Sequence, residues 1–271
     1  MLLNDKVALV TGAAGNVGRG LVKGLARHGA HVIMNDINAE GLETLAAECR
    51  TQGWSVSPAL ADLCDGEAMQ AVVDRAVADH GSLDILVNNA IIYPHKGEEG
   101  PFLTITAAGW REFMSRNMDA LFFTTHAATR VMARQRRGSI LNMSSNGAIL
   151  AHRQLIAYDA LKGAVDAYTR ALAVDLAPWQ IRVNALRPVM ITDPAPPGSE
   201  QEALLDRLGA QIPMGRVARP ADAAWACVFL SADEAEFITG QIINIDGGML
   251  EQSRPPELEL KPAVGPDDIE L

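Results

Sequence analysis

The sequence predicts an α/β fold: a doubly wound parallel sheet with helices on both faces, in a single domain of residues 1–250. Two observations support this prediction. Short apolar runs rich in β-branched residues alternate with segments of helical length throughout that range. The runs also carry apolar side chains at consecutive positions, which is typical of strands that helices cover on both faces.

The expected elements alternate regularly along the chain. Strands are expected at 7–10, 32–34, 84–87, 139–143, 181–186 and 243–245. Helices are expected at 17–28, 39–52, 66–80, 107–134, 156–177 and 220–231. Because a helix between two strands brings the second strand back parallel to the first, this order is that of a Rossmann fold.

Two segments interrupt the alternation. Residues 192–219 are rich in proline and glycine around a short helical piece from Glu200 to Leu208, and a long excursion of this kind is typical of a substrate loop. Residues 251–271 form an acidic tail with four prolines, six acidic and two basic residues. Since this composition excludes a regular helix or strand over its length, we expect the tail to be disordered or to lie as an arm on a neighbouring subunit.

Charge and composition exclude several classes of protein. The formal net charge of −10 argues against a nucleic-acid partner. No run of about 18 uncharged apolar residues is present and charges follow closely on the first methionine, so we expect a cytoplasmic protein without a membrane segment. The three cysteines, Cys49, Cys64 and Cys227, are far apart, and we interpret them as reduced thiols rather than disulfide partners or zinc ligands.

A glycine-rich turn follows the first expected strand and leads into a helix. Its sequence, TGAAGNVG at 11–18, allows the backbone to turn tightly and to approach a pyrophosphate, whose charge the helix N-terminus would meet. We expect dinucleotide contacts from Gly12, Asn16, Val17 and Gly18. A plain turn from strand to helix remains the alternative, because a glycine-rich turn alone is a weak signal.

Asp36, at the end of the second strand, predicts which dinucleotide binds. It lies 18 residues after Gly18, where a carboxylate accepts hydrogen bonds from the adenosine ribose hydroxyls and repels a 2′-phosphate. Gly15 and Ile37 occupy the positions that would otherwise carry a base for that phosphate, so the sequence predicts NAD(H). The alternative is that Asp36 only caps a helix starting near Asn38.

Tyr158 and Lys162 are the candidate acid/base pair. Their spacing in a helical segment stacks them on one face, one turn apart. A neighbouring ammonium favours the tyrosinate, and lowering a phenol pKa from about 10 towards 7 requires roughly 4 kcal/mol. Such a tyrosine can serve as a general base near neutral pH. A surface pair on a helix is the alternative if the motif is considered alone.

Further motifs fall in the order and spacing of a known family. Over its first 250 residues the chain resembles the short-chain dehydrogenase/reductase family. The motifs that carry the resemblance are the turn at 11–18, Asp62-Leu63 after the family's third strand, Asn88-Asn89-Ala90 after its fourth, Asn117, Ser144-Ser145, Tyr158 with Lys162, and Asp246-Gly247-Gly248.

The resemblance implies catalytic roles. Tyr158 would exchange a proton with the oxygen of a secondary alcohol or ketone, and Lys162 would lower its pKa and hold the nicotinamide ribose. Ser145, 13 residues before Tyr158, would orient the substrate oxygen in preference to Ser144. Asn117 would hold a water that links Lys162 to solvent.

The resemblance also extends the cofactor contacts. Asp62 and Leu63 would contact adenine, and Asn89 and Ala90 the ribose side. Asn88 is expected to brace strands instead. Near the nicotinamide, the expected contacts are Ile191 and Thr192.

Four positions depart from the family pattern. Asn16 stands at the middle glycine of the turn, where we expect little harm because asparagine tolerates a left-handed conformation. Ile91 replaces a glycine after Asn88-Asn89-Ala90, and Val189 replaces another after Pro188. The expected threonine comes one residue early, at Thr192, so the nicotinamide half of the site is the less regular one.

Loop residues indicate the substrate class. Polar side chains favour a polyol, sugar or hydroxy acid, and the two histidines among them have no ligand partner at metal-binding spacing, so no metal is expected. These residues are Tyr93, His95, Lys96, His152, Arg153, Gln154 and the segment 193–215.

The resemblance further implies a homo-oligomer, usually a tetramer built on the helices at 107–134 and 156–177. Phe122, Phe123 and Trp179 could belong to that surface, but we assign them to the core. Two other functions remain open: an NADPH-dependent ketone reductase, which Asp36 opposes, and a dinucleotide-binding regulatory protein, which Ile91 and Val189 motivate.

Overall fold

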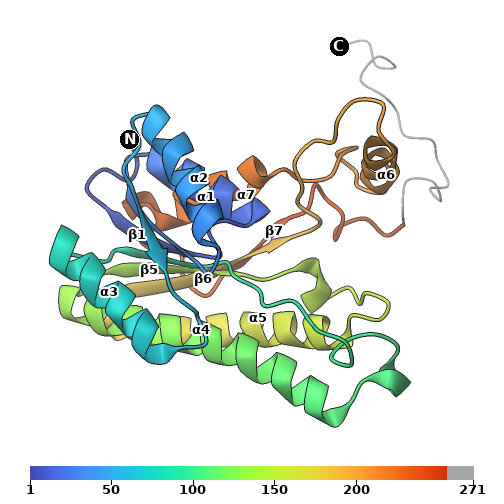
Figure 1. The fold of residues 1–271 in the computed structure, drawn as a ribbon, viewed down its shortest axis with the longest axis horizontal. Helices are drawn as coiled ribbons and strands as arrows, with labels where there is room; N and C mark the ends of the chain where they lie inside the picture. Colours follow the sequence, from blue (N-terminus) through green and yellow to red (C-terminus); the bar gives the residue numbers. More distant parts are fainter. Residues whose placement is uncertain (255–271) are drawn as a thin grey trace.

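A seven-stranded sheet forms the centre of the molecule (Figure 1). The computed structural model describes residues 1–254; the greater part of the acidic tail, 255–271, lies outside the described residues. The strand order is β3-β2-β1-β4-β5-β6-β7, and every neighbouring pair is parallel. The strands are β1 Val7–Thr11, β2 His31–Asp36, β3 Val56–Leu60, β4 Ile85–Asn88, β5 Gly138–Met143, β6 Ile181–Pro188 and β7 Ile242–Ile245.

Helices cover both faces of this sheet, as predicted. In Figure 1, α1, α2 and α7 lie on one side of the strands, and α3, α4 and α5 lie on the other. A shorter helix, α6, stands apart within the predicted substrate loop. The helices are α1 Asn16–Arg27, α2 Ala39–Thr51, α3 Gly66–His80, α4 Ala107–Gln135, α5 Ile156–Leu176, α6 Glu200–Gly209 and α7 Pro220–Ser231.

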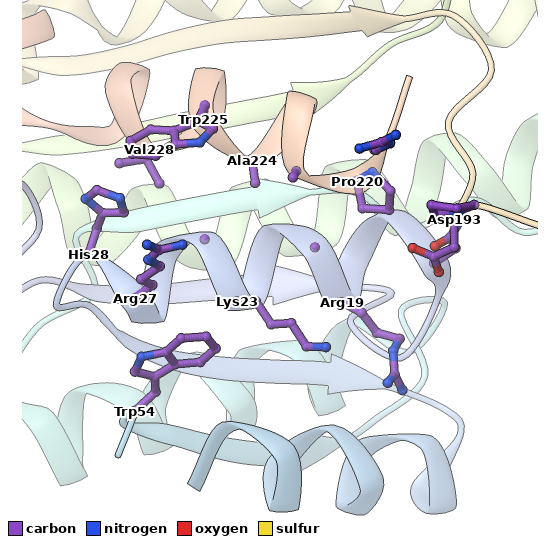
Figure 2. Close-up of a pocket in the computed structure, with 16 residues that line it drawn as sticks. Arg19, Lys23, Arg27, His28, Trp54, Asp193, Pro220, Ala224, Trp225 and Val228 are labelled. Atoms are coloured by element: carbon purple, nitrogen blue, oxygen red, sulfur yellow. The ribbon is translucent and has the colours of Figure 1, made fainter. Parts of the chain in front are cut away.

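Helices α1 and α7 pack closely because α1 presents glycines at the contact. A Cβ on Gly20 would lie 2.3 Å from the Pro220 side chain, and one on Gly24 would lie 2.8 Å from Ala224 Cβ. Pro220 and Ala224 of α7 face α1 in Figure 2. The close approach fixes the position of α1, whose N-terminus opens onto the carboxyl edge of the sheet.

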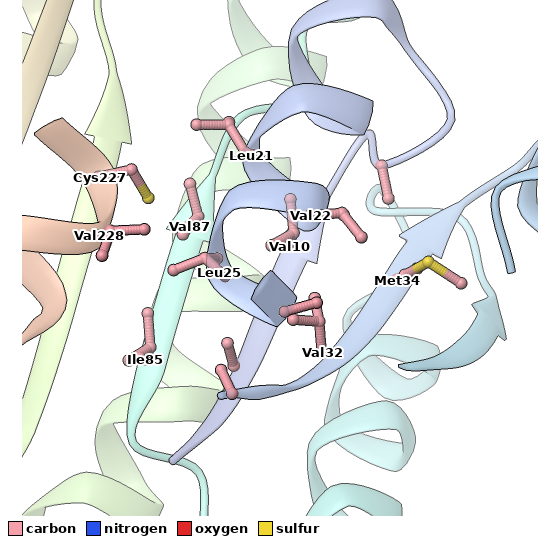
Figure 3. Close-up of a cluster of buried hydrophobic side chains, with 14 of the residues drawn as sticks. Val10, Leu21, Val22, Leu25, Val32, Met34, Ile85, Val87, Cys227 and Val228 are labelled. Carbon is pink, nitrogen blue, oxygen red and sulfur yellow. The ribbon is translucent and has the colours of Figure 1, made fainter. Parts of the chain in front are cut away.

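Two apolar clusters hold the layers together. One packs α1, α2 and α7 on the sheet and includes the buried side chains of Leu21, Leu25 and Cys227, which converge on the strands in Figure 3. The other packs α3, α4 and α5 on the opposite face and includes Met69 and Met132. Since both faces are covered, side chains at successive positions of the central strands are buried, as in β1 and β4.

The six predicted strands and all of the predicted helices are present, with bounds that differ by at most two residues. The seventh strand, β3, has the sequence VSPAL and lies at the sheet edge. The apolar runs did not reveal it, and only the family resemblance placed a third strand before Asp62. Pro58 is tolerated there because an edge strand can leave one backbone position without a ladder hydrogen bond. The core assignment was wrong for Phe122 and Trp179, which are 50% and 40% exposed.

Candidate active site

The carboxyl ends of the parallel strands gather nearly all of the predicted site residues at one edge of the sheet. A cavity of about 510 Å³ lies there, beside the turn between β1 and α1. Ile191 lines this cavity, whereas Thr192 does not line it in the described structure; its amide donates to the Ala218 carbonyl at 3.0 Å. The other predicted cofactor contacts that line the cavity are Gly12, Asn16, Val17, Gly18, Asp36, Asp62, Leu63, Asn89 and Ala90.

The glycine turn packs tightly on itself and on Ala90 because two of its positions admit no side chain. Gly12 has a φ of +62°, and a Cβ on it would lie 2.9 Å from Ala90 Cα. A Cβ on Gly18 would lie 2.1 Å from the Gly12 carbonyl oxygen. The turn therefore presents backbone amides at the N-terminus of α1, a cradle that fits a dinucleotide pyrophosphate.

Asn16 fits this turn for a different reason from the one we expected. It is the first residue of α1 and has no positive φ, so tolerance of a left-handed conformation plays no part. The N-cap, Gly15, is extended at φ −72°. Asn16 Nδ2 donates to the Ile191 carbonyl at 3.5 Å, which links the turn to the start of the substrate loop.

Asp36 holds the turn in place from the end of β2. Its Oδ2 accepts from the Ala14 amide at 2.9 Å and its Oδ1 from the Asn38 amide at 3.0 Å. The alternative role as the cap of α2 is wrong, because Asn38 is the N-cap and accepts from the Gly41 amide at 2.9 Å. A carboxylate oxygen accepts more than one hydrogen bond, so Asp36 retains capacity for ribose hydroxyls.

The asparagines after β4 have distinct structural partners. Asn88 Nδ2 donates to Asn142 Oδ1 at 2.9 Å and to Thr125 Oγ1 at 3.0 Å, which confirms that it braces strands. Asn89 Nδ2 donates to the carbonyls of Thr11 and Gly12 at 2.9 and 3.1 Å. Asn89 therefore ties the end of β4 to the glycine turn.

Tyr158 and Lys162 lie one turn apart on α5. Lys162 is 5% exposed; its Nζ donates to the Met143 carbonyl at 2.8 Å and lies 5.6 Å from the centroid of the Tyr158 ring. Burial lowers the pKa of Lys162 to about 8, and the nearby Asp166 carboxylate opposes that shift. Burial raises the pKa of Tyr158, opposed by the Ser145 hydroxyl. Among the protein's own groups, desolvation thus outweighs the predicted lowering of the phenol pKa.

Ser145 and Asn117 complete the predicted catalytic group. Ser145 Oγ donates to Asn146 Oδ1 and accepts from the Gly147 amide, both at 3.2 Å. Asn117 Oδ1 accepts from the Ile92 amide at 2.9 Å, and its Nδ2 donates to the Ile92 carbonyl at 3.0 Å. A cavity of about 30 Å³, large enough for a water molecule, is lined by both Asn117 and Lys162.

Two of the unusual side chains have structural partners. Ile91 packs against a buried cluster that includes Phe113 and Leu161, with Tyr158 beside it. Val189 is 7% exposed and packs with Ile212, where it anchors the substrate loop. Both departures from the family pattern therefore contribute to packing around the site.

Two neighbouring glutamates, which the sequence analysis missed, tie the loop after β4 to both catalytic helices. Glu98 is buried, and its Oε2 accepts a hydrogen bond from Arg116 Nη2 at 2.7 Å. Arg116 directly precedes Asn117 on α4. Glu99 accepts from the amides of Ala157 and Tyr158, both at 3.0 Å, where α5 has no cap from its own N-cap residue. No sequence motif marks these contacts, since each partner is distant along the chain.

His152 and Asp159 add a polar pair beside Tyr158. His152 Nδ1 and Asp159 Oδ1 are 2.8 Å apart, and the His152 amide donates to Asp159 Oδ2 at 2.7 Å. The rings of His152 and Tyr158 meet edge to face, with centroids 6.3 Å apart. Asp159 therefore occupies Nδ1 of the His152 imidazole, and Nε2 can serve a ligand.

Two further properties concern only residues 1–254. No group of three or more histidine, cysteine, aspartate or glutamate side chains in this range is arranged to hold a metal ion. None of its helices combines the length and the apolar character needed to cross a membrane.

Comparisons with known proteins agree with this geometry. Residues 12–250 match the family model described as enoyl-(acyl carrier protein) reductase. A 3-oxoacyl-(acyl-carrier-protein) reductase of Thermotoga maritima is 34% identical over 92% of this chain and 100% of that protein.

Solved structures give the same result. A gluconate 5-dehydrogenase from Burkholderia cenocepacia in complex with NADP and tartrate is 31% identical, with a TM-score of 0.81 over 92% of this chain and 97% of that one. An NAD⁺-bound xylitol dehydrogenase is 30% identical, with a TM-score of 0.82 over 92% and 100%. The chain therefore belongs to the short-chain dehydrogenase/reductase family, oxidoreductases that act on CH–OH groups with a nicotinamide dinucleotide.

Proposed function

We propose that this protein is an NAD(H)-dependent dehydrogenase of secondary alcohols, with a polyol, sugar or hydroxy acid as substrate. The observation that supports the proposal is that Tyr158 and Lys162 lie one turn apart on α5. Lys162 lines a small cavity that shares Ala90 and Ile91 with the larger cavity lined by Asp36.

Asp36 is the basis for choosing NAD(H) over NADP(H). A carboxylate at this position repels a 2′-phosphate, and the neighbouring Ile37, 73% exposed, offers it no positive charge. Relatives do not decide the question, because one solved structure holds NADP and another NAD⁺. The alternative of an NADPH-dependent reductase is therefore opposed by the local charge alone.

In the proposed reaction the protein's residues handle the proton. The dinucleotide, when bound, supplies or accepts the hydride. Tyr158 takes the proton of the substrate hydroxyl during oxidation and returns it during reduction. Ser145 donates a hydrogen bond to the substrate oxygen, and Lys162 stabilises the tyrosinate. The water-sized cavity between Lys162 and Asn117 gives the proton a route onward.

The polar surroundings of Tyr158 support a hydroxylated or anionic substrate. His152, oriented by Asp159, can present its free ring nitrogen to a substrate hydroxyl or carboxylate. The names of the gluconate and xylitol dehydrogenases point to the same substrate class. We also propose that the protein works in the cytoplasm as a single-domain subunit, and that exposed Phe122 on α4 and Trp179 after α5 belong to a homotetramer interface.

A regulatory protein with weak catalysis is the less favoured alternative. Ile91 and Val189 motivated this alternative, but both side chains pack in apolar clusters. The chain also keeps Ser145, Tyr158 and Lys162. No observation in the described structure now favours it over an enzyme.

One experiment tests the proposal. Polyols, sugars and hydroxy acids are screened for formation of reduced cofactor with NAD⁺ and NADP⁺, using wild type, Tyr158→Phe and the control Tyr168→Phe. Tyr168 is a largely buried tyrosine of the same helix, remote from the proton chemistry. Tyr158→Phe should lower kcat by about 10²- to 10⁴-fold, while Tyr168→Phe stays near wild type. Equal turnover in all three proteins would refute the role of Tyr158.

A further inference from the structure

A second cavity lies along the outer side of α1 and α7 and meets the cavity beside the glycine turn at Asn16, which lines both. It encloses about 470 Å³ and is called the α1/α7 groove below. Figure 2 shows its side chains arranged along α1, with α7 on one side and Trp54 on the other. The residues on which the argument depends are Arg19, Lys23, Arg27, Trp54, Arg219 and Trp225.

The groove is positively charged although the protein carries a net charge of −10. It is lined by four arginine or lysine side chains and by one acidic residue, Asp193. Arg19 and Lys23 share Glu48 as an ion-pair partner, at 2.6 and 2.9 Å. Within residues 1–254, Arg27 and Arg219 form no ion pair and both are exposed. The groove therefore offers unbalanced positive charge to an acidic partner.

Two tryptophans add exposed aromatic surface between these charges. Trp225 is 58% exposed, and its ring meets that of His28 edge to face at 4.7 Å. Trp54 packs its inner side on the core cluster of α1 and α2. Aromatic walls of this kind bind extended proline-containing peptides, whose rings and apolar side chains stack on them.

The chain itself contains a segment with matching chemistry. Residues 255–271 hold five acidic residues, one lysine and four prolines. Negative charge and proline occur together in this segment, with Leu258, Leu260 and Ile269 as apolar side chains. Its charge and its prolines complement the arginines and the tryptophans of the groove.

The segment also begins near the groove. Met249 packs on the cluster that contains Ala218, whose next residue, Arg219, lines the groove. Gln252 Nε2 donates to the Gln211 carbonyl at 2.9 Å, which holds the chain against the same loop just before residue 255. A stretch of 17 residues reaches at most about 60 Å, whereas a 12-residue helix such as α1 is about 18 Å long.

We propose that residues 255–271 bind in the α1/α7 groove of their own chain. Their carboxylates contact Arg27, Arg219 and Lys23, which lies one turn before Arg27 on α1, and their prolines and apolar side chains contact Trp54 and Trp225. This inference does not depend on the proposed enzymatic reaction. It replaces the expectation of an arm on a neighbouring subunit with a contact inside one chain.

Carbodiimide cross-linking of the full chain tests the proposal, because the reagent joins a lysine to a carboxylate in direct contact. Peptide mass analysis should find Lys23 joined to acids of 255–271, in protein that still runs as a monomer on a denaturing gel. The Lys23 link to Glu48, 2.9 Å away, serves as the internal positive control. Lys6 and Lys96, which lie outside the groove, serve as negative controls.

Charge reversal is the second part of the test. Arg27→Glu with Arg219→Glu should reduce the yield of the Lys23-to-tail product by at least about 10-fold, and adding Asp267→Arg with Asp268→Arg should restore it. Thermal unfolding checks that each variant is folded. The proposal is overturned if Lys23 links only to Glu48, if the tail links equally to Lys6 and Lys96, or if tail links form only between chains.

Discussion

Lys162 is a buried ammonium whose main partner is a carbonyl, and its titration has a measurable consequence. Its pKa is about 8 in the folded protein and 10.5 when exposed. Between these values the native state binds fewer protons than the unfolded state, so the free energy of unfolding rises with pH across this window. The full effect of such a shift is about 3 kcal/mol.

Comparison with Lys162→Met isolates this contribution, because methionine fills a similar volume and does not titrate. From pH 8 to 10 the wild type should gain stability relative to the variant by about 2 kcal/mol. Urea unfolding at pH 7.5, 8.5 and 9.5 measures the difference. If the difference in the free energy of unfolding between the two proteins stayed constant with pH, Lys162 would not titrate in this range.

Asp36 holds the glycine turn, and in the proposed function it also selects the dinucleotide; the two roles can be separated. Asp36→Asn keeps the shape and removes the charge that repels a 2′-phosphate, so the ratio of NADP⁺ to NAD⁺ affinity should rise by about 10-fold or more. Asp65→Asn is the matched control, because Asp65 also accepts from two backbone amides but caps α3. Calorimetric binding of both dinucleotides gives the ratio. An unchanged ratio in Asp36→Asn would argue against charge as the basis of the preference.

At the scale of elements, α5 depends on a cap that comes from another part of the chain. Glu99 lies 58 residues before Ala157, and its Oε1 accepts a hydrogen bond from the Ala157 amide. Glu99→Gln leaves a single acceptor for two amides, which should shift Tyr158 and lower kcat by roughly 10-fold with little change in dinucleotide affinity. The exposed Glu112 of α4 provides the control, Glu112→Gln. Equal kcat values for the two variants would exclude a positioning role for Glu99.

The elements also show how far the sequence predicts the structure. Alternating apolar runs and helical patterns predicted the seven helices and six of the strands that the structure describes in residues 1–254, since burial of these patterns determines the layers. Strand β3 was expected from the family resemblance but not from the apolar runs, because Ser57 and Pro58 weaken its pattern and its edge position requires little burial. Asp36 and the glycine turn were found from local spacing. The contacts of Glu98 and Glu99 could not be, because no local pattern encodes a hydrogen bond to a distant helix end.

At the scale of the whole molecule, the all-parallel sheet separates its two edges by role. Every strand ends at the edge that holds the cavity beside the glycine turn, and the turns from helix to strand lie at the other edge. At Gly81, in the turn from α3 to β4, an added Cβ would meet no atom within 4 Å. A peptide insertion after Gly81 should therefore leave kcat and KM within about 2-fold of wild type, whereas one after Pro94 should abolish turnover. Steady-state assays of both variants measure this, and loss of activity in the Gly81 variant would contradict it.

The same separation of edges matters for practical use. A protein tethered to a solid support through the Gly81 turn would be held in one orientation, with its catalytic face directed toward the flowing solution. Diffusing substrate and recycled cofactor would then reach every immobilised molecule equally, which random attachment through surface lysines does not provide.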